Sequence, residues 1–350
     1  MITIAIVGAT GLVGGKMLQV LQEQGFAGCD IIAAASPKSI GKEIEFAGRH
    51  LTVVSVEEAI ARKPQYAVFS AGASASRQYA PLFAATGCTV IDNSSCWRMD
   101  PNVPLVVPEI NMDAVGSDHR IIANPNCSTI QMVLAISSLH RRYGIRRLVI
   151  STYQSVTGTG IKAIRQLESE ERYFADHQVP SARLRETMQT ELGDSYQPAY
   201  PNQIFRNLFP HGGDFTPDGY TTEELKLVNE TRKILGDDTI QITSTVARVP
   251  VVGGHSEAVN VELRQDYDLD EVRRLIAGTP GVVLCDNPDE NRYPMPVMAE
   301  DTDAVYVGRL RRDFSQPNTL NLWCVSDNLR KGAATNAIQI LKRLTERSHV

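Results

Sequence analysis

Apolar residues in the first part of the chain recur in short runs that predict alternating strands and helices. Ile2 to Val7 is a continuous apolar run of strand length, and apolar residues at helical spacing from Met17 to Leu21 follow it and stop near Gly25. Further runs of strand length are Ile31 to Ala35, Tyr66 to Ser70 and Thr89 to Asp92. Strands that alternate with helices build a doubly wound parallel sheet, so we predict an α/β unit here.

The pattern changes after Cys127, where apolar residues from Ile130 to Leu139 predict a buried helix. Later runs of strand length predict a second sheet, of mixed type: Arg147 to Thr152, Ile240 to Val249, Ala258 to Leu263, Ala304 to Leu310 and Leu320 to Ser326. Helices are predicted at Thr222 to Leu235, Asp268 to Ala277 and, with an amphipathic pattern, Leu329 to Leu344. Residues 195–220 are rich in Pro, Gly, Tyr and Asn, which predicts a long loop over a site or a subunit contact.

The length of 350 residues fits two domains at the usual size of roughly 150 residues each. We place one domain at 1–127 plus 328–350 and a second, α+β domain at 128–327. Hydrophobic residues make up 43% of the chain and charged residues 21%, which excludes a disordered chain. The net charge of −5 and the lack of a basic block argue against a nucleic-acid partner.

The apolar runs and the six cysteines bear on the cellular location of the protein and on metal binding. No basic segment precedes the first apolar run, and no later stretch reaches about 18 apolar residues, so we expect neither a signal peptide nor a membrane partner. The six cysteines lie far apart, without a C-x-x-C pair or a histidine at metal-ligand spacing. We therefore expect no metal and a reducing, cytoplasmic location.

A glycine-rich turn joins the first strand to the first helix. Gly8, Gly11 and Gly14 have the spacing that lets a backbone approach a pyrophosphate, and the helix that follows points its free N–H groups at that anion. Their position between a strand and a helix predicts a Rossmann-type dinucleotide site with Gly8, Thr10, Gly11, Leu12 and Val13 as contacts. The alternative is a tight turn without a ligand.

The end of the second strand bears on the choice of dinucleotide. An NAD-binding protein usually has Asp or Glu here, whereas this chain has Ser36, Lys38 and Ser39. A cation and two hydroxyls suit a 2′-phosphate, so we predict NADP as the cofactor. The alternative is a solvated loop with a lysine that binds nothing.

Cys127 differs from the other cysteines in its context. The turn Asn124-Pro125-Asn126 follows a strand, and Cys127 opens an apolar helix. A sulfur at a helix N-terminus has its pKa lowered by the helix dipole, which favours the reactive thiolate. Taken alone, such a cysteine is also compatible with simple packing.

Other polar residues add candidate chemistry. His255 is flanked by Gly253 and Gly254 in a predicted turn, where an acid or base can reach a substrate, and Arg248 lies in an otherwise apolar strand and needs an anionic partner. That partner is a bound carboxylate or a buried acid. Arg98 ends a polar segment after a strand, and Glu223 and Lys226 share a helix face. The alternative for these is a surface turn and a solvated ion pair.

Several of these segments together resemble aspartate-semialdehyde dehydrogenases over nearly the whole chain. The matching stretches are GATGLVG, DNSSCWRMDPNVPLVVPEIN, ANPNCSTIQ, STYQSVTGTG, EELKLVNETRKIL, RVPVVGGHSEAVN and SDNLRKGAATNA. The resemblance implies NADPH-dependent reductive dephosphorylation of L-aspartyl 4-phosphate to L-aspartate 4-semialdehyde, on the route to lysine, threonine and methionine. It also implies a second domain for catalysis and dimerisation, and a homodimer or homotetramer. Departures such as Ser155 and Thr157 put local packing in doubt.

The resemblance also implies a role for each matching residue. Cys127 corresponds to the nucleophile that forms a thioester, His255 to the acid or base, and Gln154 to the residue that orients the substrate. Arg248 corresponds to the ligand of the substrate α-carboxylate. Further substrate or phosphate contacts are Arg98, Asn126, Glu223 and Lys226, and further cofactor contacts are Gly158 and Asn328.

The sequence argues against three other functions. N-acetyl-γ-glutamyl-phosphate reductase shares the chemistry, but Glu223 suits a free ammonium group. Glyceraldehyde-3-phosphate dehydrogenase has a different cysteine motif. A non-catalytic NADP-binding regulator would typically lack the cysteine or the histidine, and both are present here.

Overall fold

The apolar runs of the first domain form a five-stranded sheet in which all neighbouring strands are parallel. The structure is a computed structural model and describes residues 2–347. In spatial order the strands are β2 (Asp30–Ala34), β1 (Thr3–Val7), β5 (Tyr66–Phe69), β6 (Thr89–Asp92) and β7 (Ile121–Ala123). The predicted doubly wound sheet is confirmed.

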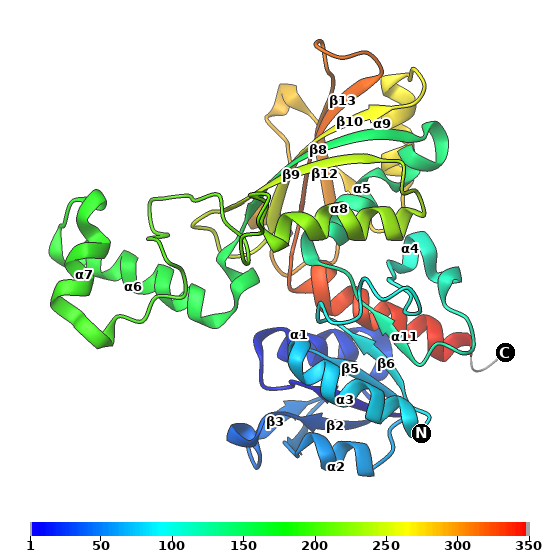
Figure 1. Cartoon of the computed structure of the whole chain (residues 1–350), viewed down its shortest axis with the longest axis vertical. Helices are drawn as coiled ribbons and strands as arrows, with labels where there is room; N and C mark the ends of the chain where they lie inside the picture. The colour runs from blue at the N-terminus through cyan, green and yellow to red at the C-terminus, as the bar shows by residue number, and fades with distance from the viewer. Residues whose placement is uncertain (1, 348–350) are drawn as a thin grey trace.

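Helices cover both faces of this sheet, because its strands are apolar on both sides. The helices are α1 (Leu12–Leu21), α2 (Val56–Ala61), α3 (Ala73–Ala85) and α11 (Thr335–Arg347). α2 and α3 pack on one face, and α1 and α11 share the core on the other, where Ile338 and Leu341 join Met17 and Leu21. Figure 1 shows α11 in red, returning from the far end of the chain to this domain.

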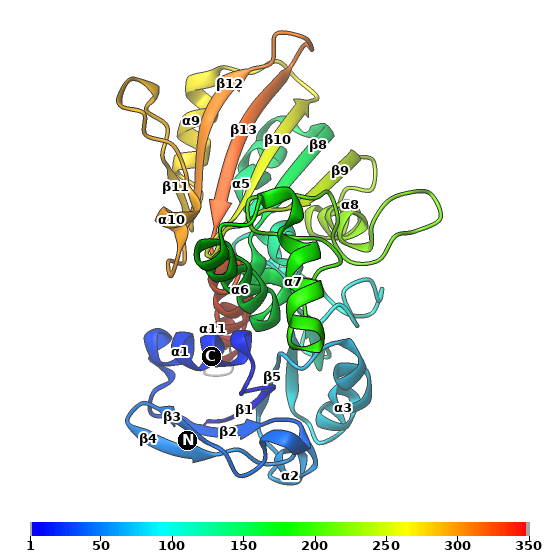
Figure 2. The ribbon, with the colours of Figure 1, turned by 90° about the vertical axis from the view of Figure 1, so that its left-hand side faces the viewer.

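The second domain is built on a six-stranded mixed sheet, as predicted. In spatial order its strands are β11 (Val282–Leu284), β12 (Val305–Arg312), β13 (Thr319–Ser326), β10 (His255–Leu263), β8 (Ile145–Gln154) and β9 (Gln241–Arg248). The two outer pairs are parallel and the inner pairs antiparallel. α5 (Cys127–Tyr143), α8 (Thr222–Leu235) and α9 (Leu269–Ala277) share the main apolar core with the sheet, which Figure 2 shows face-on.

An arm made of residues 161–220 extends to one side of the second domain (Figure 1). It contains α6 (Ile161–His177) and α7 (Leu184–Leu192), neither of which was predicted, and then the predicted long loop. Buried Glu170 orders this loop, because its carboxylate accepts hydrogen bonds from the Tyr196 hydroxyl at 2.7 Å and from the backbone N–H groups of Ile204 at 2.9 Å and Phe205 at 2.8 Å.

Smaller elements complete the chain. A hairpin of β3 (Glu43–Phe46) and β4 (Arg49–Thr52) was not predicted. Short helices are α4 (Pro108–Asn111) and α10 (Pro296–Ala299), and 3₁₀ turns lie at Pro37–Ser39, Met112–Ala114, Val156–Thr159, Ser181–Arg183, Gly193–Ser195 and Pro288–Glu290. Two π-helical segments, Gln22–Phe26 and Arg330–Ala334, extend α1 and precede α11.

Two sequence-based predictions, the turn at His255 and the domain boundaries, were not confirmed by the structure. His255 was expected within a turn, but it is the first residue of β10 because it pairs with Ser326 of β13. The boundaries of the two domains stay predictions, and residues 1 and 348–350 lie outside the described residues.

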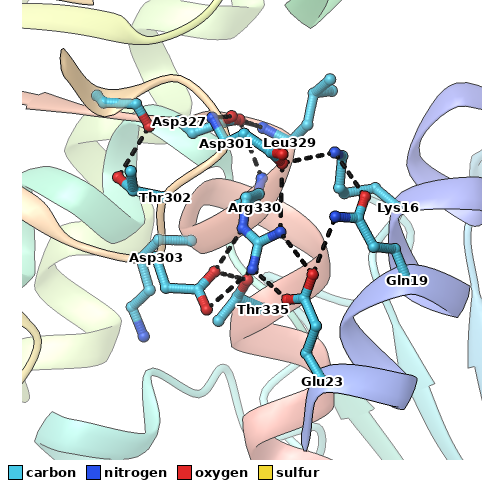
Figure 3. A network of polar contacts seen from close by, with 12 residues as sticks. Lys16, Gln19, Glu23, Asp301, Thr302, Asp303, Asp327, Leu329, Arg330 and Thr335 are labelled. Carbon is cyan, nitrogen blue, oxygen red and sulfur yellow. Dashed lines mark hydrogen bonds and ion pairs between the residues drawn. The ribbon is translucent and has the colours of Figure 1, made fainter.

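Arg330 links the two domains through ion pairs between its buried guanidinium and three partly exposed carboxylates (Figure 3). Its side chain is 6% exposed, and it donates to Asp303 at 2.8 Å, to Asp301 at 3.3 Å and to Glu23, which follows α1. Lys16 of α1 pairs with the same Asp301 at 2.8 Å. The network therefore joins the first helix to the loop before β12 and to the start of the C-terminal helix.

We expect Arg330→Met to lower the free energy of unfolding by about 1 to 2 kcal/mol, because the three carboxylates lose their shared cation but are 36–58% exposed and stay hydrated. Urea unfolding measures the change. The matched control is Arg343→Met, since Arg343 is exposed and its pair with Glu346 spans 3.5 Å. The control should shift the free energy by less than about 0.5 kcal/mol. Equal effects of the two substitutions on the free energy of unfolding would mean that the Arg330 ion pairs do not stabilise the fold.

Candidate active site

A pocket of about 300 Å³ lies between the two domains, where α5 begins opposite the segment that precedes α11. Most of the predicted site residues line it: Val13, Arg98, Asn126, Cys127, Gln154, Gly158, Glu223, Lys226, Arg248, His255 and Asn328. The predicted residues that do not line it belong to the cofactor set: Gly8, Thr10, Gly11, Leu12, Ser36, Lys38 and Ser39. Chain segments far apart in sequence thus meet around one sulfur.

Cys127 is the first residue of α5, as predicted. Asn126 caps this helix, and its Oδ1 accepts from the backbone N–H groups of Ser128 at 3.1 Å and Thr129 at 3.3 Å. The other end of the Asn126 amide donates to Glu223 at 2.7 Å. Gly332 faces the cysteine so closely that a Cβ added there would lie 3.0 Å from Cys127 Cβ. The cap and the glycine fix the position of the sulfur.

The pKa of Cys127 is shifted opposite to the prediction from the sequence. Burial, followed by the nearby charge of Glu223, raises the pKa of the thiol to about 11, against the lowering effect of Arg248, Arg98 and Lys226. The prediction that the helix N-terminus lowers the pKa of Cys127 and so increases its thiolate fraction is therefore wrong. Burial dominates because a thiolate loses its hydration there.

We expect Glu223→Gln to speed the alkylation of Cys127 by iodoacetamide at pH 8 by about threefold to tenfold. Removing the carboxylate charge lowers the thiol pKa, so more thiolate is present at any pH below that pKa. Peptide mass spectrometry of the modified cysteine gives the rate. Glu290→Gln, at an exposed acid outside the pocket, is the control. Slower alkylation in the Glu223 variant would contradict the assigned sign.

His255 is buried and neutral. Burial, followed by the charge of Arg248, lowers its pKa to about 3. Its Nδ1 accepts the backbone N–H of Ser155 at 3.0 Å, so the proton of the neutral ring resides on Nε2. Among the described residues Nε2 has no hydrogen-bond partner, and a Cβ added at Gly158 would lie 3.0 Å from it. The imidazole therefore presents an N–H donor to the pocket.

Arg248 is a buried cation without a carboxylate partner. Arg248 is the last residue of β9. Among the described residues, its Nη1 donates only to the backbone oxygen of Ser155, at 3.3 Å. Within residues 2–347 it forms no ion pair, although the sequence predicted an anionic partner. A buried guanidinium is stable only when it is compensated, so the geometry favours a bound anion as the partner.

Buried Glu223 and half-buried Lys226 form an ion pair at the start of α8, with 2.7 Å between Oε2 and Nζ. Burial acts to raise the pKa of Glu223, but the charge and hydrogen bond of Lys226, with Arg248, lower it to about 2. The carboxylate is thus ionised in the pocket. The alternative of a solvated surface pair does not apply, because Glu223 is buried.

Arg98 reaches the pocket from the segment after β6. It pairs with Glu230 at 3.1 Å and donates to the Asn93 carbonyl at 2.9 Å, while its Nε has no partner among the described residues. Glu230 also accepts the backbone N–H of Asn126 at 2.6 Å. Sequence reasoning missed Glu230, although it lies two helical turns after Glu223 in the predicted helix and so shares its face.

Ser155 and Thr157, which depart from the resemblance, hold the neighbouring Asn328. Their hydroxyls donate to Asn328 Oδ1 at 3.0 and 2.9 Å. The Ser155 hydroxyl also lies 2.9 Å from the carbonyl of Gly253, in the turn before His255, so its single hydrogen is shared between this acceptor and Asn328 Oδ1. These two hydroxyls therefore tie Asn328 to the segment that carries His255.

The glycine-rich turn fits a dinucleotide because side chains cannot be accommodated there. Gly8 has φ +92° and an added Cβ would lie 2.5 Å from the Ser70 carbonyl oxygen, and one at Gly14 would lie 2.1 Å from the Gly8 carbonyl oxygen. Both positions require glycine, which keeps the turn narrow and its backbone open to an anion.

The predicted 2′-phosphate segment lies beside this turn. Thr10 Oγ1 donates to Ser39 Oγ at 3.3 Å, which joins the two. Lys38 is exposed and has no hydrogen bond or ion pair within the described part of the chain, so its charge is free to meet a phosphate.

Residues 2–347 contain no cluster of three or more His, Cys, Asp or Glu side chains arranged to bind a metal ion. None of the helices described is long and apolar enough to span a membrane. All six cysteines are free thiols.

Known proteins match the whole chain. The semialdehyde dehydrogenase NAD-binding domain matches residues 3–117, and the semialdehyde dehydrogenase dimerisation domain matches residues 136–331. The chain is 45% identical over 347 residues to the aspartate-semialdehyde dehydrogenase of Aquifex aeolicus, with 98% of each protein covered. It is 44% identical over 346 residues to the protein of that name from Legionella pneumophila, with 98% of this chain and 95% of that protein covered.

The fold is similar to that of a solved protein of the same name. The crystal structure of aspartate semialdehyde dehydrogenase II from Vibrio cholerae, complexed with ASA, superposes with a TM-score of 0.91 at 40% identity. The alignment covers 99% of this chain and 98% of that one.

Proposed function

The chain belongs to the aspartate-semialdehyde dehydrogenase family, and from this premise we propose that it reduces L-aspartyl 4-phosphate to L-aspartate 4-semialdehyde and phosphate with NADPH. The observation that carries the proposal is the surroundings of Cys127. A half-buried thiol at a helix N-terminus shares its pocket with Arg98, Lys226 and Arg248, which has no ion pair among the described residues. A substrate with two anionic ends and an acyl carbon between them suits this arrangement.

The cations of the pocket bind different groups of the substrate. Arg248, which has no ion pair among the described residues, binds the α-carboxylate in a forked contact. Arg98 and Lys226 hold the phosphate, and the ionised Glu223 accepts the substrate ammonium. A free ammonium is absent from an N-acetylated substrate, so Glu223 argues for the aspartyl compound.

Catalysis begins at the sulfur. Cys127 Sγ bonds to the acyl carbon, the bond from that carbon to the phosphate oxygen breaks, and the thiol proton leaves with the phosphate as HPO₄²⁻. The product of this step is a thioester on Cys127. Arg98 and Lys226 stabilise the charge that collects on the leaving phosphate.

The second half of the reaction uses His255. NADPH, when bound along the glycine-rich turn, supplies the hydride that reduces the thioester carbon. The Nε2–H of His255 donates a hydrogen bond to the thioester oxygen when that oxygen becomes negative. When the carbon–sulfur bond breaks, the oxygen becomes a carbonyl again and the aldehyde leaves. The Cys127 sulfur then takes up one proton from solvent, which restores the thiol for the next turnover. Burial of the pocket keeps water from the thioester.

An absorbance assay at the nicotinamide band tests the function in the reverse direction. Aspartate semialdehyde plus phosphate should reduce NADP, and the reaction should depend on phosphate. N-acetylglutamate semialdehyde is the competing substrate. Faster turnover of the acetylated compound, or no turnover of either, would reject the proposal.

We expect Lys38→Glu to weaken NADP binding at least about tenfold and to change NAD binding by less than about twofold. The new carboxylate repels the 2′-phosphate, which NAD lacks. Fluorescence titration of the reduced cofactors measures both constants. Lys42→Glu, at an exposed lysine nearby, is the control for charge alone. An equal loss for both cofactors would reject NADP selection by Lys38.

We further propose a homodimer in the cytoplasm. The match to a dimerisation domain over 136–331 supports self-association, and the arm at 161–220 offers a surface outside the main core. Six free thiols suit a reducing compartment. Light scattering after gel filtration tests the dimer, and a tetramer would correct it.

A further inference from the structure

A buried acid lies behind the site and none of the steps above uses it. Glu257 is the third residue of β10, fully buried, with Thr152 of β8 and Cys324 of β13 as its neighbours across the sheet. Because side chains alternate along a strand, Glu257 and His255 point to the same face of the sheet. α5, which begins at Cys127, packs against β10.

Glu257 forms no ion pair within residues 2–347. The Cys324 thiol lies with its Sγ 3.6 Å from Oε2, and the polar side chains of Gln131 and Ser128 also lie beside the carboxyl. Burial raises its pKa well above the ordinary range, against weaker effects of Cys324, Gln131 and Ser128 beside the carboxyl. Burial without a cation favours the neutral form of such a carboxyl group.

The hydrogen-bond inventory around Glu257 supports the same protonation state. Gln131 Nε2 donates to the backbone carbonyl of His255 at 3.3 Å, which leaves Gln131 Oε1 as an acceptor. Gln131 Oε1 and Glu257 Oε1 are both buried without a close partner. A buried carboxylate oxygen without a donor is costly, whereas a protonated Glu257 has an O–H that can donate to an acceptor beside it, such as the Gln131 side chain.

Ser128 connects this acid to the pocket. Gln154 Nε2 donates to Ser128 Oγ at 2.8 Å, so the hydroxyl hydrogen of Ser128 is free to point to the Glu257 carboxyl. The same bond leaves Gln154 Oε1 buried without a partner, on a residue that lines the pocket with Cys127. The orientation of the Gln154 amide therefore depends on Ser128, and that of Ser128 on Glu257.

We propose that Glu257 is a positioning residue, a neutral carboxylic acid that orients Gln154 through Ser128 and supports the His255 backbone through Gln131. It makes Gln154 present an acceptor oxygen, and not its NH₂ group, to a substrate on Cys127. The proposal rests on the proposed function, because its kinetic readout is the turnover assigned above.

Two substitutions separate the neutral acid from other roles. Glu257→Gln keeps a donor and an acceptor without a charge, so kcat should stay within about threefold. Glu257→Met keeps the volume but loses both, so kcat should fall by about 10-fold to 50-fold, with NADPH affinity unchanged. Glu262→Gln and Glu262→Met, on the same strand but paired with Arg146, are the controls. A Met variant within threefold of wild type, or a Gln variant as slow as the Met variant, would overturn the proposal.

A double-mutant cycle tests the path through Ser128. Ser128→Ala should slow turnover to a similar extent, and the double variant with Glu257→Met should be no slower than the slower single variant. Additive losses would mean that Glu257 does not act through Ser128 and would overturn the assignment.

The protonation state has a readout that does not need turnover. The infrared difference between wild type and Glu257→Gln at pH 7 should contain the carbonyl stretch of a protonated carboxylic acid. A carboxylate band in its place would overturn the proposal. If the wild type turned over no aspartate semialdehyde, the proposed function would fail, whereas this spectrum would still test the state of Glu257.

Discussion

Replacing Cys127 with alanine should reduce turnover by at least about 10⁴-fold while NADPH affinity stays within about twofold. Without the sulfur no thioester forms, and the remaining groups of the pocket have no acyl carbon bonded to them. Of the cofactor contacts predicted at the glycine-rich turn, Gly8, Thr10, Gly11 and Leu12 lie outside the pocket that holds Cys127, so NADPH binding should be little affected. Steady-state kinetics and fluorescence titration of NADPH measure the two quantities.

The control for this prediction is Cys29→Ala, because Cys29 is partly buried against the first domain's core and does not line the pocket. It should retain full activity. Intact-protein mass spectrometry adds a direct observation, since wild type incubated with the acyl phosphate alone should gain the mass of the acyl group. More than a few per cent of turnover in the Cys127 variant would exclude covalent catalysis at this residue.

Arg248→Leu should lower kcat/KM by about 10²-fold to 10³-fold without lowering stability. The lost guanidinium is the proposed ligand of the substrate carboxylate, so substrate binding and orientation both suffer. Removing it also removes a buried charge that has no ion pair in residues 2–347, so the free energy of unfolding should stay the same or rise. Kinetics and urea unfolding of the same preparation give the two values.

Arg248→Lys is the matched variant, because it keeps the positive charge and loses the two parallel N–H donors of the guanidinium. It should recover less than about a tenth of the wild-type kcat/KM. Full activity in the lysine variant would mean that charge alone binds the substrate. A large loss of stability in Arg248→Leu would mean that Arg248 serves the fold and not the substrate.

Local patterns predicted the elements that are regular and apolar. The parallel strands of the first domain, the helix Thr222 to Leu235 and the helix that begins at Cys127 lie where the sequence indicated. Each has a long apolar periodicity or a clear capping residue, such as Asn126 before Cys127. The arm helices α6 and α7 were missed because most of their residues are polar and their small apolar cores are formed within the arm.

The chemistry of the site was less accessible to sequence reasoning. Residue types indicated which side chains to consider, and the pocket brings Cys127, His255 and Arg248 together. The pKa of Cys127 was predicted with the wrong sign, because burial and the neighbouring Glu223 depend on segments nearly 100 residues away in the chain. Glu230 and Glu257 were overlooked for the same reason, since their partners are known only from the folded chain.

The return of α11 to the first domain has a consequence for how the protein is made. Ile338 and Leu341 complete a core that includes Met17 and Leu21, so until α11 is made this face of the nascent N-terminal sheet is covered by α1 without its second helix. At ordinary elongation rates the wait for the final helix is roughly 10 to 50 s. During that interval the exposed apolar face is a substrate for chaperones, and a transcript truncated before the last helix should yield an aggregating product.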